Sequence, residues 1–188
     1  MQALLTSTVM VALAEMGDKT QLLSFVLAAR FRRPWPILLG ILLATLANHS
    51  LAGAVGAWIA TLVSPAALRW IIAGSFFVFG LWALRPDELS EDPAMPSAGV
   101  FLTTLVAFFL VEMGDKTQLA TVALAARYDS LAAVVLGTTL GMLVANAPAV
   151  WMGERLAHRV NMKIMRRAAA ALFFIFALLT LINRGGAA

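Results

Sequence analysis

An eight-residue segment, EMGDKTQL, occurs twice in this chain, from Glu15 to Leu22 and again, letter for letter, from Glu112 to Leu119. Each copy places two carboxylates and an ammonium group within an apolar run that is long enough to cross a bilayer. A charged side chain near the bilayer centre costs roughly 3 kcal/mol on insertion scales. Two matched clusters of such groups therefore indicate a functional site inside a membrane.

The duplication extends beyond the motif. At an offset of 97 residues (112 minus 15), 12 of the 16 positions from Glu15 to Arg30 are identical to those from Glu112 to Arg127. The chain therefore consists of two copies of one unit, each about half its length. The predicted organisation is a first repeat at residues 1–85, an acidic, proline-rich linker at 86–97 and a second repeat at 98–188.

Composition places the chain in a lipid bilayer. Apolar residues make up 61% of the 188 and charged residues 13%, against about half and a quarter in soluble domains. Six apolar runs, each near the ~20 residues of a spanning helix, are predicted at 3–29, 36–63, 66–85, 98–127, 130–157 and 164–184. The first is interpreted as a mature helix rather than a signal peptide, because no Lys or Arg precedes it. We expect an all-α membrane protein with six transmembrane helices.

Basic residues predict the orientation of these helices, because Lys and Arg gather on the cytoplasmic side. Three residues lie on one side of the expected membrane: Arg69, Arg127 and Arg184. Nine lie on the other: Arg30, Arg32, Arg33, Arg85, Arg155, Arg159, Lys163, Arg166 and Arg167. The nine-residue side is predicted to be cytoplasmic, with the linker, and both termini external. The net charge of +4 is thus a topology signal, and no nucleic-acid partner is expected.

Three helices per repeat is an odd number, so the second repeat enters the membrane from the opposite side to the first. The expected fold is two inverted three-helix repeats, in which a substrate site lies near the midplane. On a continuous helix, Glu15, Asp18 and Lys19 would share one face. The second copy repeats this spacing at Glu112, Asp115 and Lys116. If all six groups are ionised, the joined clusters carry a net charge of −2, which one divalent cation neutralises.

Other polar groups near the motifs are candidate ligands. Hydroxyl oxygens are available at Thr20 and Thr117, and amide carbonyls at Gln21 and Gln118. Gly17 and Gly114 either permit close helix packing or unwind a turn of each motif helix.

Asn48 and Asn146 lie within the second and fifth apolar runs, where an amide either ligates a cation or bonds between helices. The 97-residue offset aligns His49 with Asn146, but a one-residue slip aligns the two asparagines, and that alignment is preferred here. His49 is interpreted as a structural residue.

An all-oxygen site suits hard cations such as Ca²⁺, Mg²⁺ or Mn²⁺, and the absence of cysteine argues against zinc or copper. Met16 and Met113 are interpreted as packing residues, with a thioether ligand for Mn²⁺ as the alternative. No cofactor is expected beyond the transported cation. Clustered carboxylates without a cation should bind protons, so cation binding should release them.

The paired motif resembles the Gdt/MneA-type family of duplicated membrane cation transporters, which includes Golgi manganese and calcium/proton antiporters and bacterial manganese exporters. The family pattern is Glu, any residue, Gly, Asp, Lys or Arg, then Ser or Thr, and both copies fit it at every position. The resemblance implies divalent cation transport coupled to protons. The short segment before the first motif resembles the bacterial members, which implies efflux across the bacterial inner membrane.

Other functions are compatible with paired carboxylates. An intramembrane enzyme could use them as acid and base, but each copy carries a lysine and the copies are equivalent, so the chain is predicted not to be an enzyme. A membrane assembly subunit, a sodium-coupled carrier and an uncoupled carrier are further alternatives. The sequence does not indicate an oligomeric state.

Overall fold

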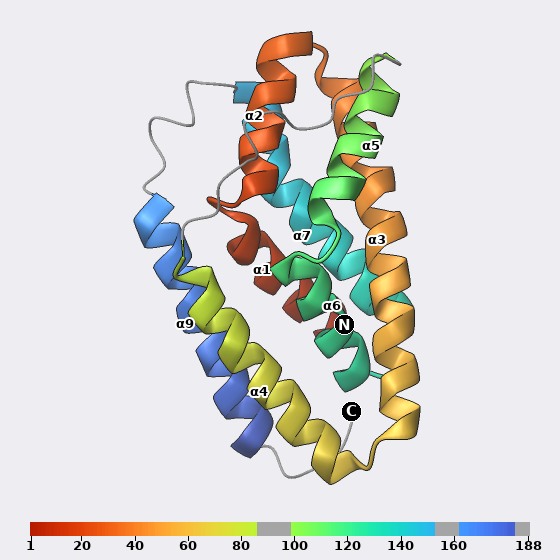
Figure 1. Cartoon of the computed structure of the whole chain (residues 1–188), viewed down its shortest axis with the longest axis vertical. Helices are drawn as coiled ribbons and strands as arrows, with labels where there is room; N and C mark the ends of the chain where they lie inside the picture. Colours follow the sequence, from red (N-terminus) through yellow and green to blue (C-terminus); the bar gives the residue numbers. More distant parts are fainter. Residues whose placement is uncertain (86–98, 153–161, 183–188) are drawn as a thin grey trace.

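The computed structural model describes residues 1–85, 99–152 and 162–182, and every regular element within these ranges is an α-helix (Figure 1). The helices are α1 (Gln2–Glu15), α2 (Lys19–Phe31), α3 (Pro34–Leu62), α4 (Pro65–Ala83), α5 (Val100–Glu112), α6 (Lys116–Arg127), α7 (Leu131–Met152) and α9 (Met162–Ile182). The all-α class is confirmed. The predicted linker at 86–97 lies outside the described residues.

Local sequence accounts for where the helices begin and end. Pro34 and Pro65 stand in the first turns of α3 and α4, where a missing N–H has no intrahelical partner to lose. The side chain of Ser64 caps α4 by accepting the Ala67 N–H. The apolar runs expected at 3–29 and 98–127 are each divided into two helices, α1 with α2 and α5 with α6, and both divisions fall inside the EMGDKTQL motif.

The two repeats pack against each other through equivalent contacts. Helix α1 lies along α7, and α3 lies along α5, as Figure 1 shows. Gly40 on α3 and Gly137 on α7 are equivalent at the 97-residue offset. A Cβ on Gly40 would lie 2.7 Å from the Cβ of Thr104, and a Cβ on Gly137 would lie 2.9 Å from the Cβ of Ser7, the residue equivalent to Thr104. Such reciprocal contacts are those of a two-fold relation between the halves.

Helices α4 and α9 are equivalent in the two repeats and pack against each other, side by side in Figure 1. The rings of Phe76 and Phe173, which are equivalent residues, are 6.3 Å apart. The rings of Phe77 and Phe174, also equivalent, are 5.4 Å apart. A contact between a residue and its own equivalent places each of these pairs across the axis that relates the repeats.

The surface is inverted relative to that of a soluble protein. Large apolar side chains face outward, with Leu39, Phe77 and Val144 each more than half exposed, whereas Glu15 and Glu112 are buried. An apolar surface of this extent is typical of a membrane-embedded protein. Helices α3, α4 and α7 are long and apolar enough to span a bilayer, while α1 and α5 are shorter apolar helices.

Exposed tryptophans mark two levels along α3, as in the aromatic belts of membrane proteins. Trp35 and Trp151 meet edge to face, with ring centroids 5.6 Å apart. Trp58 and Trp70 are exposed near the junction of α3 and α4. Trp35 and Trp58 are separated by about 35 Å of helical rise, which is close to the ~30 Å of a hydrocarbon core. The chain is therefore a membrane protein.

We predict that Gly137→Ala destabilises the protein, because the new Cβ would lie 2.5 Å from the carbonyl oxygen of Leu4 and would force α1 and α7 apart. Overpacking of this kind costs about 1–3 kcal/mol. The thermal unfolding midpoint of the detergent-purified variant should fall clearly. Gly74→Ala is the matched control, since a Cβ on Gly74 meets nothing within 4 Å. An equal midpoint for the two variants would contradict the close packing of α1 on α7.

Candidate functional site

Both motifs break their helices at the glycine. Helix α1 ends at Glu15, Met16 is extended, Gly17 has φ 86°, and α2 begins after Asp18. In the second copy the residue with positive φ is Gly114, at 76°. A side chain would be strained in this conformation, which glycine adopts freely. Of the two hypotheses for these glycines, the structure supports the helix break. The expectation of three charged side chains on one continuous helical face is wrong, because the helix ends between them.

The motif glutamines satisfy the backbone at each break. The Oε1 atom of Gln21 accepts the Gly17 N–H at 2.9 Å, and the Oε1 atom of Gln118 accepts the Gly114 N–H at 2.7 Å. A backbone N–H freed by a broken helix inside a membrane needs such a partner. The two glutamine oxygens, predicted as cation ligands, thus already stabilise the broken turns.

Each motif threonine holds one oxygen of its own glutamate. The Thr20 hydroxyl donates to Oε2 of Glu15, and the Thr117 hydroxyl donates to Oε1 of Glu112 at 2.6 Å. The other oxygens, Oε1 of Glu15 and Oε2 of Glu112, are buried and accept no hydrogen bond from the described residues. Buried polar atoms normally have a partner, so these two oxygens are open to a ligand.

The lysines pair with the aspartate of the opposite repeat. Lys19 Nζ lies 3.1 Å from Oδ1 of Asp115, and Lys116 Nζ lies 2.8 Å from Oδ1 of Asp18. These reciprocal ion pairs join the two motifs. They also balance each aspartate with a lysine, which leaves the two glutamates as the negative charge of the cluster.

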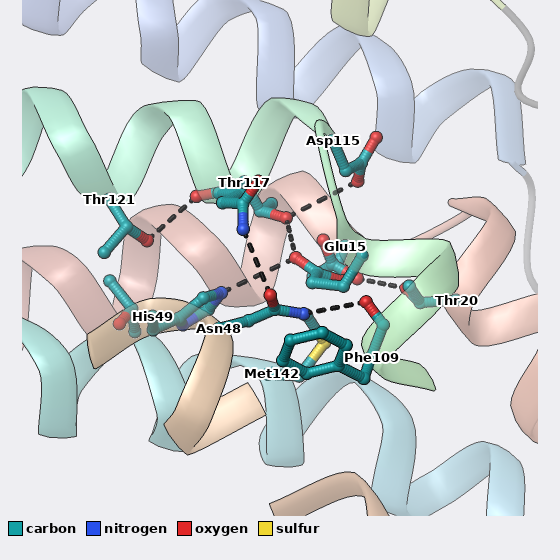
Figure 2. Close-up of polar contacts among 12 residues, drawn as sticks. Glu15, Thr20, Asn48, His49, Phe109, Asp115, Thr117, Thr121 and Met142 are labelled. Atoms are coloured by element: carbon teal, nitrogen blue, oxygen red, sulfur yellow. Dashed lines mark hydrogen bonds and ion pairs between the residues drawn. The ribbon is translucent and has the colours of Figure 1, made fainter. Parts of the chain in front are cut away.

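Three of the four predicted carboxylates converge. Glu15, Glu112 and Asp115 can each bring one oxygen within 4.8 Å of the others, and all three are buried. Figure 2 shows Glu15 and Asp115 around Thr117, at the point where the two broken helices meet. Three carboxylate oxygens at this separation are suited to hold a hard cation.

The predicted amides lie beside the cluster, where they join helices. Gln118 Nε2 donates to Oδ1 of Asn48 at 3.1 Å, and Asn48 Nδ2 donates to the carbonyl of Phe109 at 3.0 Å. Asn146 accepts from the Ser24 hydroxyl at 2.7 Å. Ligation by these amides stays a prediction, and the hydrogen bonds support the interhelical role.

The preferred alignment of Asn48 with Asn146 is wrong. Gln21 and Gln118 are equivalent residues, and Gln21 Nε2 donates to the carbonyl of Ala145, whereas Gln118 Nε2 donates to Asn48. Position 48 therefore corresponds to position 145, as the plain 97-residue offset gives and as Gly40 and Gly137 also require. His49 is then the counterpart of Asn146.

The structure brings one unexpected side chain to the cluster. His49 on α3 is fully buried, and its Nε2 lies 3.5 Å from Oε1 of Glu112 (Figure 2). The available signal in the sequence was the position of His49 opposite Asn146 in the unslipped alignment. Met113, by contrast, is 56% exposed, which disfavours a thioether ligand from that residue.

Comparisons with known proteins agree with the duplication of the sequence. A family model described as "Divalent cation/proton antiporter GDT1" matches residues 3–91 and again 100–187. A Vibrio cholerae protein named "Putative manganese exporter" is 47% identical, with 96% of this chain and 90% of that protein covered. GDT1-like protein 5 of Arabidopsis thaliana is 30% identical over 97% of this chain and 96% of its own length. A GDT1-like protein of Synechocystis is 27% identical over 91% and 92%. No solved structure matches significantly.

We predict that Lys116→Met destabilises the protein more than Lys19→Met does. The Lys116 side chain is 3% exposed and Lys19 is 24% exposed. Removing one partner of a buried ion pair costs about 3–5 kcal/mol, because the other charge stays buried, and the pair made by Lys19 is the less buried of the two. The comparison is made on thermal unfolding midpoints. Adding Asp18→Asn to Lys116→Met should recover much of the loss, and no recovery would argue against a direct Lys116–Asp18 pair.

Proposed function

The chain belongs to the GDT1 family of divalent cation/proton antiporters, and we propose that it exports a divalent cation, Mn²⁺ foremost and Ca²⁺ second, in exchange for protons. Each of the two matched segments carries one EMGDKTQL motif. The family is one of transporters, and the reciprocal site offers two equivalent halves rather than the distinct acid and base environments of an enzyme.

One observation carries the proposal. Glu15 and Glu112, one from each repeat, are buried beside each other, each with one oxygen held by a threonine and one without a hydrogen bond. A divalent cation between them would provide a partner for the free oxygen of each carboxylate. We infer that Glu15, Glu112 and Asp115 bind the cation directly and that Asp18, paired with Lys116, takes part as the fourth carboxylate.

The charge of the cluster fits one divalent ion. With Lys19 balancing Asp115 and Lys116 balancing Asp18, the ionised glutamates leave two negative charges. A site of carboxylate oxygens suits Mn²⁺, Ca²⁺ and Mg²⁺. The name of the Vibrio cholerae relative favours manganese among these. The hydroxyls of Thr20 and Thr117 donate hydrogen bonds to the glutamates in this conformation. If the site rearranges during transport, these hydroxyls are candidate ligands for the cation.

Proton exchange follows from the closeness of the carboxylates. Three buried carboxylates within 4.8 Å repel one another when ionised, so without a cation the cluster is most stable with protons bound. A divalent cation displaces those protons, and protons displace the cation. The groups act as one coupled set rather than as independent sites. If the site opens to the two sides of the membrane in turn, this competition couples cation export to an inward proton gradient.

We infer that the repeats are inverted in the membrane, with six spans formed by α1 with α2, α3, α4, α5 with α6, α7 and α9. The reciprocal contacts at Gly40 and Gly137 and between α4 and α9 support a two-fold relation between the halves. In such transporters, broken helices meet at a midplane site, and movement of one repeat against the other opens it to each side in turn. Residues 1–85 and 98–188 would be the two repeats.

We predict a bacterial inner-membrane protein with the start of α3 cytoplasmic and both termini external, from the nine-to-three distribution of basic residues. The natural chain has no cysteine, so single cysteines can be labelled cleanly. An impermeant thiol reagent added to intact cells should label Ser64→Cys, at the end of α3, and leave Arg33→Cys, at its start, unlabelled. The reverse pattern would show that the orientation is opposite.

Transport itself is tested with the purified chain in liposomes. We predict Mn²⁺ movement that is driven by an imposed pH gradient, is indifferent to a sodium gradient, and weakens in apparent affinity as the pH of the Mn²⁺-containing side falls. Glu15→Gln and Glu112→Gln should each abolish it, because either substitution removes half of the paired glutamate site.

Asp129→Asn is the matched control, since Asp129 is an exposed carboxylate outside the motifs and should be dispensable. Normal flux in both glutamate variants would overturn the shared site. Flux that follows sodium, or that ignores both gradients, would replace proton antiport by sodium coupling or uncoupled transport.

A further inference from the structure

The proposed transport mechanism leaves one buried, chemistry-bearing group beside the carboxylates unused. His49 lies on α3, is 0% exposed, and has neither ring nitrogen in a hydrogen bond within the described residues. Its Nε2 lies 3.5 Å from Oε1 of Glu112, and a dashed line from the His49 ring marks this contact in Figure 2. An imidazole of this kind points to a ligand rather than to packing alone.

The cost of burying unpaired polar atoms makes packing alone a poor explanation for His49. A buried polar atom without a partner costs about 1–3 kcal/mol, and native structures retain few such atoms. The 3.5 Å separation exceeds the 2.7–3.2 Å typical of an N–H···O hydrogen bond. Two ligands that each lie about 2.1 Å from one octahedral cation are about 3 Å apart. The spacing of Nε2 and Oε1, the Glu112 oxygen that also accepts from Thr117, is therefore near that of two ligands sharing a cation.

The second repeat provides an internal comparison. Asn146 is the counterpart of His49, and its amide is satisfied at both ends. Its Oδ1 accepts from the Ser24 hydroxyl at 2.7 Å, and its Nδ2 donates to the carbonyl of Met142 at 3.0 Å. The equivalent positions thus differ in chemistry: one has a satisfied amide, and the other has an imidazole with no hydrogen bond at either nitrogen within the described residues.

We propose that His49 is a nitrogen ligand of the transported cation and selects first-row transition ions over Ca²⁺ and Mg²⁺. This inference rests on the proposed function, because it adds one ligand to the carboxylate site. Ca²⁺ and Mg²⁺ bind oxygen almost exclusively in proteins, whereas transition ions accept imidazole. The three carboxylates whose oxygens converge, Glu15, Glu112 and Asp115, do not include His49, which meets the site at Glu112. With them the ligand set would stay mostly oxygen, which suits Mn²⁺ within the transition series.

Pulsed electron paramagnetic resonance of Mn²⁺ bound to the full-length protein tests the inference directly. Coordinated imidazole nitrogen should produce a ¹⁴N hyperfine signal that becomes a ¹⁵N signal when ¹⁵N-histidine is incorporated. His49→Gln should remove it, and His49→Asn, which copies the second repeat, is the alternative where the glutamine variant does not fold. His158→Gln is the matched control, because His158 is the other of the two histidines in the chain, and it should retain the signal.

Selectivity is the second readout. In competition between Mn²⁺ and Ca²⁺ for the purified protein, His49→Gln should lower the preference for Mn²⁺ by about tenfold or more, an effect of the size expected for loss of a metal-site contact. Mn²⁺ that binds without a histidine hyperfine signal in the natural protein, or with unchanged preference in both His49 variants, would overturn the histidine inference and leave the transport proposal intact. Mn²⁺ that does not bind, or binds equally well to Glu15→Gln and Glu112→Gln, would overturn the carboxylate site itself.

Discussion

Burial of four carboxylates in an apolar interior is the constraint on which the rest of the structure depends. Charges of one sign held this close, away from water, are unfavourable unless other groups compensate them. The two lysines compensate the aspartates, and each does so across the boundary between repeats. Each repeat thus supplies the counter-charge for the aspartate of the other. The halves are therefore joined by electrostatics as well as by the packing of α1 on α7 and α3 on α5.

The broken helices explain how so many polar groups reach one place. In a continuous helix, side chains three or four residues apart follow one face along its length. At Gly17 and Gly114 the chain instead turns, so that one helix ends at a glutamate and the next begins after an aspartate. The cost of the break is limited because the motif glutamines bind the freed N–H groups. A motif of seven consecutive residues, from glutamate to glutamine, thus contains two carboxylates, a lysine that balances the aspartate of the other repeat, and support for its own broken backbone.

The site is two-fold in outline but unequal in detail. Gly17 is buried and Gly114 exposed, while Lys116 is buried more deeply than Lys19. An alternating-access carrier opens to one side at a time, so any single conformation must break the symmetry of its repeats. His49 and Asn146 make the halves unequal in composition as well.

The sequence by itself determined the class, the duplication and the charged residues of the site. A hydrophobic run of spanning length and an exact repeated motif are local signals, and a buried charge is so costly that its position alone indicates function. Tertiary structure decided which residues are partners. Lys19 could equally have paired with Asp18 beside it, and only the packing of the repeats directs it to Asp115. The sequence alone also did not determine which residues of α3 and α7 are equivalent, and so did not show that His49 lies beside Glu112. Two alignments one residue apart are nearly equal in similarity, and hydrogen bonds and glycine contacts between helices distinguish them.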